Sequence, residues 1–285
     1  MKLRYQVPMA HYCSYGIGGP ARFFVEPENI HEIREAVLFS KDKKIPYFIL
    51  GKGSNVLISD RGLNGIVIKI GDRFATLQTS GNKVSAGAGI LLNVLINKIA
   101  AENLGGFEVL AGIPGSLGGA VVMNAGANRV FIGSFVEGVE AVSPDGDFVY
   151  LDNKHLGFSY RHSLLQKTKH ILYKIYIHAE VLPQDILLGN IRHAQAKRKK
   201  HPVLPSCGST FRNPPEMAAG RLIEDMGLKG IRCGNAQISP EHGNFIVNLG
   251  GARAKDVFYL INLTRKKAAE RGIDLKPEVK IWGDF

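Results

Sequence analysis

Cysteine is scarce in this chain, and the cysteines present are far apart. The 285 residues include only three, Cys13, Cys207 and Cys233. An odd number at such wide spacing fits neither a disulfide framework nor the closely spaced ligand pairs of a zinc site. We therefore expect no metal and free thiols, as in the reducing cytoplasm.

Long hydrophobic runs are also missing. The first residues, 1–12, lack the apolar core of a signal peptide, and no run approaches the roughly 18 apolar residues of a membrane-spanning helix. We expect a cytoplasmic protein that does not insert into a membrane.

Acidic residues are outnumbered by basic ones. The chain has 36 Lys and Arg against 25 Asp and Glu, which gives a formal net charge of +11. Such a balance favours anionic partners, either nucleic acid or phosphorylated small molecules. The one dense basic cluster, residues 197–200, is too short to define a nucleic-acid surface, and no recognised nucleic-acid motif accompanies it. A basic nucleic-acid-binding protein therefore remains only the non-enzyme alternative.

Glycine, by contrast, is abundant, with 33 residues. A first glycine-rich loop, residues 51–55, falls between two expected strands, 46–50 and 56–58. It lacks the third glycine of a Rossmann fingerprint and the spacing of a Walker loop. Successive backbone N–H groups in such a turn can still form a nest for phosphate oxygens. An ordinary turn between strands explains the spacing equally well.

A second glycine-rich block covers residues 112–127 and contains Gly-Ile-Pro-Gly-Ser-Leu-Gly-Gly. Residues without a side chain allow the backbone to pass very close to a flat or charged group. One such block is weak evidence. Two in one chain fit a dinucleotide, which has two phosphates and a ring system.

Hydrophobic spacing predicts alternating strands and helices around these loops. The expected strands are 21–25, 46–50, 56–58, 65–70, 83–88, 138–143, 147–151, 171–181 and 277–282. The expected helices are 28–44, 91–104, 185–199, 218–226 and 254–271, and Gly105-Gly106 would cap the second of them.

Six segments, taken in order, resemble the UDP-N-acetylenolpyruvoylglucosamine reductase family. They are residues 14–21, 51–55, 112–119, 158–161, 207–211 and 277–279. The ordered series spans nearly the whole chain and is far more specific than any single member. It implies an α+β protein with a PCMH/vanillyl-alcohol-oxidase-type FAD-binding fold and a C-terminal substrate-binding α+β domain.

The resemblance also implies three subregions. Residues 1–71 and 72–201 would form two FAD-binding subdomains, and residues 269–285 would return to complete the second. Residues 202–268 would form the substrate-binding domain. We expect the protein to be a monomer.

The cofactor implied by the resemblance is FAD, held without a covalent bond, and NADPH is the implied co-substrate. The first loop would hold the pyrophosphate, and the second block would lie along the isoalloxazine and phosphate path. The implied FAD residues are Gly51, Lys52, Gly53, Ser54, Asn55, Gly115, Ser116, Gly118 and Gly119.

Three polar residues would act on a UDP-sugar enolpyruvyl substrate in peptidoglycan precursor synthesis. Arg161 would donate two parallel hydrogen bonds to the substrate carboxylate and stabilise the charge of an enolate-like intermediate. Glu278 would help to hold or polarise the same group. Ser209 would give a proton to the second carbon of the double bond. Taken alone, each residue also has an ordinary structural explanation.

Substrate contacts are implied at Tyr160 and Asn213, and at Lys199 within the basic cluster, although a solvated helix face explains that cluster equally well. His242 lies in a family-like stretch without a clear role and is expected to be structural. The short interval between Arg161 and Ser209 resembles the shorter, type II branch of the family, in which the pocket is more open.

One competing enzyme hypothesis is an alcohol or sugar oxidase with the same fold. Many such oxidases attach their flavin covalently through a histidine near the first glycine segments. The nearest candidate is His11, but the residues around it do not match that pattern.

Overall fold

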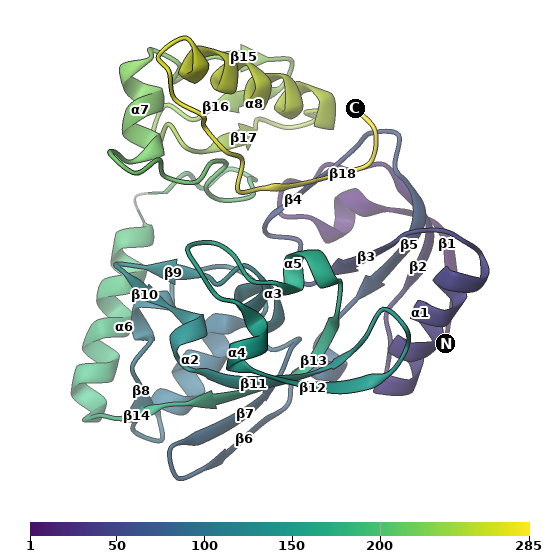
Figure 1. Ribbon diagram of the computed structural model, residues 1–285. Helices are drawn as coiled ribbons and strands as arrows, with labels where there is room; N and C mark the ends of the chain where they lie inside the picture. Colours follow the sequence, from purple (N-terminus) through teal and green to yellow (C-terminus); the bar gives the residue numbers. More distant parts are fainter. Residues whose placement is uncertain (200) are drawn as a thin grey trace. The chain divides into compact units, whose positions relative to one another are not determined.

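The computed structural model describes residues 1–199 and 201–285 (Figure 1). Its chain divides into two compact units, each assembled from segments that are far apart in the sequence. The first unit contains Met1–Arg4, Phe24–Lys52 and Gly65–Lys199, and the second contains Tyr5–Phe23, Gly53–Asn64 and Lys200–Phe285.

The first unit begins with a helix followed by two strands. Helix α1 (Ile30–Asp42) buries Ile33, Ala36 and Val37 on one face, as the helical spacing predicts. Strand β3 (Tyr47–Leu50) then pairs in parallel with β5 (Leu63–Lys69). This pairing places the first glycine loop at the carboxyl end of β3.

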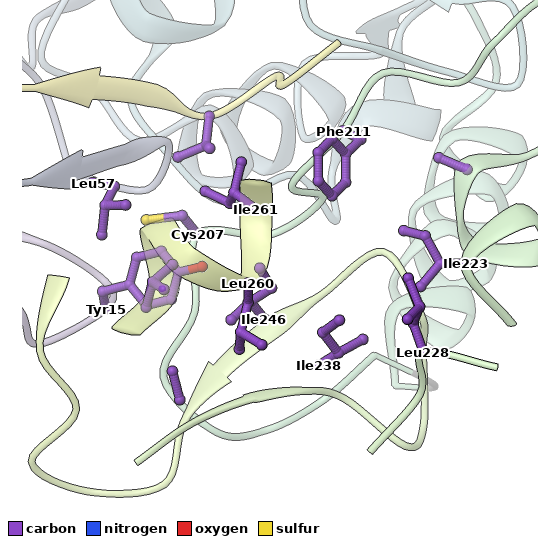
Figure 2. Close-up of a cluster of buried hydrophobic side chains, with 14 of the residues drawn as sticks. Tyr15, Leu57, Cys207, Phe211, Ile223, Leu228, Ile238, Ile246, Leu260 and Ile261 are labelled. Atoms are coloured by element: carbon purple, nitrogen blue, oxygen red, sulfur yellow. The ribbon is translucent and has the colours of Figure 1, made fainter. Parts of the chain in front are cut away.

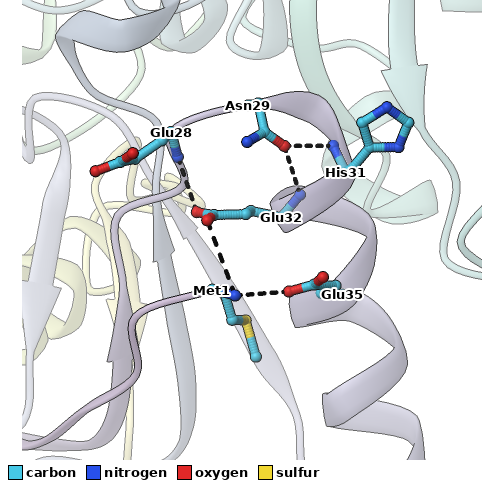
Figure 3. Close-up of polar contacts among 6 residues, drawn as sticks. All are labelled: Met1, Glu28, Asn29, His31, Glu32 and Glu35. Carbon is cyan, nitrogen blue, oxygen red and sulfur yellow. Dashed lines mark hydrogen bonds and ion pairs between the residues drawn. The ribbon is translucent and has the colours of Figure 1, made fainter.

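The start of α1 is capped by polar side chains (Figure 3). The Oδ1 atom of Asn29 accepts hydrogen bonds from the backbone N–H groups of His31 at 3.0 Å and Glu32 at 3.1 Å. The amino group of Met1 lies 2.7 Å from a carboxylate oxygen of Glu35. These contacts fix the chain end to the helix.

The rest of the first unit contains an antiparallel sheet of five strands, in the order β12-β11-β13-β7-β6. The hairpin of β11 and β12 turns through Pro144-Asp145-Gly146, where Gly146 has a φ of +91°. Helix α3 packs on β13, and α2 packs against α6. The bounds are β6 Leu77–Ser80, β7 Lys83–Gly87, β11 Val136–Val142, β12 Phe148–Asp152, β13 Ile171–His178, α2 Leu92–Ala100, α3 Leu117–Val122 and α6 Gln184–Arg198.

Two expected elements end differently in the structure. Helix α2 stops at Ala100, because Asn103 takes a left-handed φ of +60° and Leu104 continues into the short strand β8 (Leu104–Gly105). Gly105 and Gly106 therefore do not cap α2. Strand β8 pairs with β14 (Glu180–Val181), which is separate from β13, so the expected strand 171–181 is divided in two.

The second unit has a three-stranded antiparallel sheet, β15-β16-β17, together with helices α7 and α8. Figure 2 shows the hydrophobic core of this unit, where Tyr15, Leu57, Cys207 and Phe211 gather with aliphatic side chains of the sheet and helices. The bounds are α7 Ala219–Asp225, β15 Arg232–Cys233, β16 Ala236–Ile238, β17 Ile246–Asn248 and α8 Ala254–Ala269.

Helix α8 is capped by a residue from a distant segment. The carboxylate of Asp60 accepts the N–H groups of Ala254 at 2.8 Å and Lys255 at 3.0 Å, the first two residues of the helix. A negative charge at this end also interacts favourably with the helix dipole.

The C-terminal strand β18 (Lys280–Trp282) pairs in parallel with β4 (Val56–Ile58). We expected this return of the chain to complete residues 72–201, but both paired strands belong to the second unit.

The remaining strands and α-helices are β1 Arg4–Pro8, β2 Pro20–Val25, β9 Gly126–Ala127, β10 Val130–Phe131, α4 Asn153–Leu156 and α5 Leu165–Thr168. Across residues 1–199 and 201–285, no helix is both long enough and apolar enough to cross a membrane.

Candidate active site

The two glycine-rich segments meet in the first unit. Gly51 follows β3, and a Cβ atom added to it would lie only 2.5 Å from the Oγ atom of Ser116. A side chain at position 51 would therefore require the Ser116 hydroxyl to move away. Two of the predicted cofactor residues, far apart in the sequence, are thus side by side.

The next glycine of the loop, Gly53, is held in the second unit. It has a φ of +69°, and a Cβ atom there would lie 2.0 Å from the carbonyl oxygen of Tyr12. Its own carbonyl accepts the N–H of Ser14 at 3.0 Å, so the segment that starts at Ser14 adjoins the loop. The positive φ and the close Tyr12 carbonyl both require glycine at position 53.

The backbone of these loops offers donors to an anion. Among the hydrogen bonds of the described residues, none uses the N–H groups of Gly51, Lys52, Gly53, Gly115 or Ser116. Successive unused N–H groups in a glycine turn are what a phosphate group requires. The residues present therefore fit the pyrophosphate of a dinucleotide.

The other glycines of the second segment have different surroundings. Ser116 caps helix α3, and its Oγ atom accepts the N–H of Gly119 at 3.4 Å. Gly118 donates its N–H to the carbonyl of Ala88 at 2.9 Å, and a Cβ atom there would lie 3.0 Å from the side chain of Ala88. Gly118 thus allows close packing of the backbone, while the exposed Gly119 is open to a ligand.

In the second unit, Ser209 and Glu278 come from segments that run next to each other. The N–H of Glu278 donates to the carbonyl of Thr210 at 2.8 Å, and Phe211 forms an antiparallel bridge with Pro277. Ser209 directly precedes this bridge. Both Ser209 and Glu278 are half-buried, and each side chain can therefore be reached by a ligand.

Two cations that we did not predict lie near Glu278. Burial lowers the pKa of Lys280, Arg212 lowers it further, and Glu278 raises it. The Nε atom of Arg212 is buried and has no hydrogen-bond partner among the described residues. In the sequence, Arg212 directly precedes Asn213, in Phe-Arg-Asn, and Lys280 follows Glu278 by two positions, in Pro-Glu-Val-Lys. Their charges gather here only because the two segments pair.

Arg161 and Tyr160 belong to the first unit. Arg161 has a φ of +53°, in a turn closed by mutual hydrogen bonds between Ser159 and His162 at 3.0 Å. Its carbonyl accepts the side-chain N–H of Gln166 at 3.1 Å. Its guanidinium carbon lies 5.6 Å from the centroid of the Tyr160 ring. The backbone of Arg161 is therefore held firmly.

The remaining predicted residues are less informative. The Oδ1 atom of Asn213 accepts the N–H of Ala219 at 2.9 Å, so this side chain fixes the first residue of α7. Lys199 is exposed at the end of α6, and its neighbour Lys200 lies outside the described residues. Within the described part of the chain, no group of three or more His, Cys, Asp or Glu residues could hold a metal ion.

His242 has a structural environment. Its Nδ1 atom accepts the N–H of Asn244 at 3.2 Å, and its ring packs 4.9 Å from the ring of Phe245. Burial lowers the pKa of His242, which favours the neutral imidazole that this hydrogen bond requires.

Two family models match the chain. Residues 21–152 match an FAD binding domain. Residues 198–282 match the C-terminal domain of UDP-N-acetylenolpyruvoylglucosamine reductase. Together they confirm the expected α+β architecture with an FAD-binding fold, followed by a second domain specific to one enzyme.

Individual relatives agree along nearly the full length. The chain is 43% identical over 280 residues to a UDP-N-acetylenolpyruvoylglucosamine reductase of Alkaliphilus oremlandii, covering 97% of this chain and 92% of the relative. It is 39% identical to one of Caldanaerobacter subterraneus, with coverage of 99% and 94%. The crystal structure of the reductase from Thermus caldophilus superposes with a TM-score of 0.87 at 38% identity, covering 99% of this chain and 100% of that one. The chain therefore belongs to the UDP-N-acetylenolpyruvoylglucosamine reductase family.

Proposed function

We propose that this protein reduces UDP-N-acetylglucosamine enolpyruvate to UDP-N-acetylmuramate, with NADPH as the reductant and non-covalent FAD as the cofactor. The reaction adds a hydride from NADPH and one proton across the enolpyruvyl double bond and releases NADP⁺. Family membership over nearly the full chain supports the reaction, and the FAD-binding domain supports the cofactor. We place it among the peptidoglycan precursor enzymes of the cytoplasm, acting as a monomer.

The observation on which the proposal depends most is the pairing of the Ser209 and Glu278 segments beside the first glycine loop. Thr210 accepts the N–H of Glu278, and the Nδ2 atom of Asn55 donates to the carbonyl of Glu278 at 3.3 Å. The segment that carries Glu278 thus adjoins both the Ser209 segment and the loop that would hold the cofactor phosphates.

The glycine loops would hold FAD through main-chain N–H groups. Gly51, Lys52 and Gly53 in the first loop, and Gly115 and Ser116 in the second, have N–H groups that the described protein contacts leave unused. Lys52 is exposed and would add a positive charge near the phosphates. When FAD is bound, the chemistry it supplies is transfer of a hydride from NADPH to the terminal carbon of the enolpyruvyl group.

Ser209 would provide the proton. Its Oγ–H would protonate the second carbon of the double bond as the electron pair returns from the enolate, and solvent would then restore the hydroxyl proton. Serine is a weak acid, so the role requires a basic acceptor and a well-fixed donor. The backbone pairing beside Ser209 provides such a fixed position.

Arg161 and Glu278 would act on the substrate carboxylate. The planar guanidinium of Arg161 can donate two parallel hydrogen bonds to that carboxylate and stabilise the charge that develops on it. The restrained turn at Arg161 fits this role, because a fixed donor needs little rearrangement during the reaction. Glu278 would help to polarise the same group.

Tyr160, Asn213 and Lys199 would bind the rest of the substrate. Tyr160 is 45% exposed, and the exposed ammonium of Lys199 could contact the UDP diphosphate. Asn213 holds α7 through its oxygen, which leaves its NH₂ group for a ligand. The short interval between Arg161 and Ser209 supports the type II form, with an open pocket.

Steady-state turnover tests the proposal. The purified protein should be yellow and release free FAD on acid precipitation. It should consume NADPH only when the enolpyruvyl sugar nucleotide is present, and the product should gain two hydrogens by mass spectrometry. A colourless protein, or NADPH consumption that ignores this substrate, would refute the assignment.

A further inference from the structure

The side chain of Asn55 is bound to the segment that carries Glu278. Its Nδ2 atom donates to the main-chain carbonyl oxygen of Glu278 at 3.3 Å. The main-chain carbonyl of Asn55 also accepts the N–H of Lys280 at 3.1 Å. These two hydrogen bonds hold both neighbours of Val279, whose side chain is buried. The last residue of the first glycine loop therefore fixes the start of β18.

A second connection joins the same loop to the Ser209 segment. The buried thiol of Cys207 lies 3.0 Å from the carbonyl oxygen of Val56 and 3.9 Å from that of Gly53. Burial raises the pKa of this thiol, so it remains protonated and can donate. Ser209 follows two residues later. The glycine loop thus contacts both segments of the proposed site in this unit.

The chemistry at Asn55 requires an amide. The carbonyl oxygen of Glu278 only accepts hydrogen bonds, so the side chain that faces it must donate. An ionised aspartate has nearly the same shape as asparagine but presents only acceptors, and its oxygen would repel the carbonyl. Alanine would remove the donor without adding this repulsion.

We propose that Asn55 is a positioning residue. Its side-chain amide fixes the main chain of Glu278 and thereby positions the Glu278 carboxyl relative to the loop that would hold the cofactor. The resemblance implies a different role, a direct contact between Asn55 and the pyrophosphate. The inference rests on the proposed function for the reaction but not for the hydrogen bonds themselves.

Hydrogen exchange of the FAD-loaded full chain tests the connection directly. In Asn55→Asp and Asn55→Ala, the amides of residues 278–280 should exchange roughly 2- to 10-fold faster, which corresponds to the loss of one hydrogen bond. The matched control is Asn64→Asp. Asn64 is exposed and its Oδ1 atom accepts from Arg22, a role that aspartate keeps. Exchange in the control should equal that of the wild type.

The half-reactions separate positioning from cofactor binding. Both Asn55 variants should bind FAD within about 3-fold of the wild-type affinity and be reduced by NADPH at the normal rate, whereas reoxidation by the enolpyruvyl substrate should slow by about 10-fold or more. Asn55→Asp should be slower than Asn55→Ala because of the added repulsion.

Two results would overturn the proposal. Unchanged exchange at residues 278–280 together with a large loss of FAD affinity would show that Asn55 is a phosphate ligand. Global unfolding of both variants would show a general role in stability. If instead the wild type fails to reduce the substrate, the proposed function fails, and the exchange data still decide whether Asn55 holds Glu278.

Discussion

The N–H of Glu278 donates to the carbonyl oxygen of Thr210 at 2.8 Å, although the two residues are far apart in the sequence. This hydrogen bond places Ser209, the residue before Thr210, next to the segment that carries the Glu278 carboxyl. The main chain of Glu278 also adjoins the first glycine loop, because the Nδ2 atom of Asn55 donates to its carbonyl oxygen. In the proposed reaction, this pairing would let a proton donor and a carboxyl group from different segments act on one substrate.

Replacing Arg161 by lysine should lower kcat/KM for the enolpyruvyl substrate by about 10²-fold, because a single ammonium cannot fork onto a carboxylate. Reduction by NADPH should be unaffected. Rapid-mixing measurements of the two half-reactions check this, with Arg192→Lys as the control on the exposed face of α6. Equal rates in Arg161→Lys and the wild type would exclude the bidentate role.

Gly53→Ala should impair FAD binding and destabilise the fold. A methyl group would lie 2.0 Å from the Tyr12 carbonyl, and alanine disfavours the φ of +69°. The control is Gly81→Ala, where φ is +58° but no atom lies within 4 Å. We expect the control to cost about 1–2 kcal/mol, from backbone conformation alone. FAD titration and thermal unfolding distinguish the two variants. Similar losses of FAD affinity and stability in Gly53→Ala and Gly81→Ala would contradict the steric argument.

Removing the Asp60 carboxylate should destabilise the second unit. Asp60→Ala leaves two N–H groups of α8 without acceptors, which should cost about 1–2 kcal/mol in the free energy of unfolding. Asp60→Asn keeps one acceptor and should cost less. Urea denaturation checks the order, and an Asp60→Ala protein as stable as the wild type would show that the cap contributes nothing.

His242 should make the protein less stable in weak acid. Its folded-state pKa is lowered from 6.5, so below about pH 6.5 the unfolded chain binds a proton that the folded chain does not. Stability should therefore fall as the pH drops through this range. In His242→Asn, the Oδ1 atom can still accept the N–H of Asn244, and denaturation midpoints should depend less steeply on pH. The same slope in both proteins would refute this.

Much of the fold follows from local patterns in the sequence. The helical spacing of Ile33 and Val37 predicts α1, and the apolar runs on both sides of Gly51–Asn55 predict the strands there. The end of α2 could not be predicted in this way. Leu104 continues the hydrophobic period of the helix, but it pairs with Val181, a contact that depends on a strand much later in the chain.

The candidate site, like the fold, could be predicted from the sequence only in part. Gly51 and Gly53 stand out in the sequence, and at Gly53 the φ of +69° and the nearby Tyr12 carbonyl explain why glycine is required. The roles of Asn55, Arg212 and Lys280 depend on partners from distant segments, so motif spacing does not reveal them. Gly118 looks like a ligand glycine, yet its N–H is already bonded to Ala88.

Anaerobic single turnover tests the central claim, that Ser209 protonates an enolpyruvyl substrate reduced through FAD. The NADPH-reduced wild type should be reoxidised rapidly when the enolpyruvyl sugar nucleotide is added. Ser209→Ala should be reduced by NADPH at the normal rate but reoxidised about 10²- to 10⁴-fold more slowly, the range expected for loss of a general acid. Ser206→Ala, three residues earlier in the chain, should behave like the wild type. Reoxidation of Ser209→Ala at the wild-type rate would contradict the account.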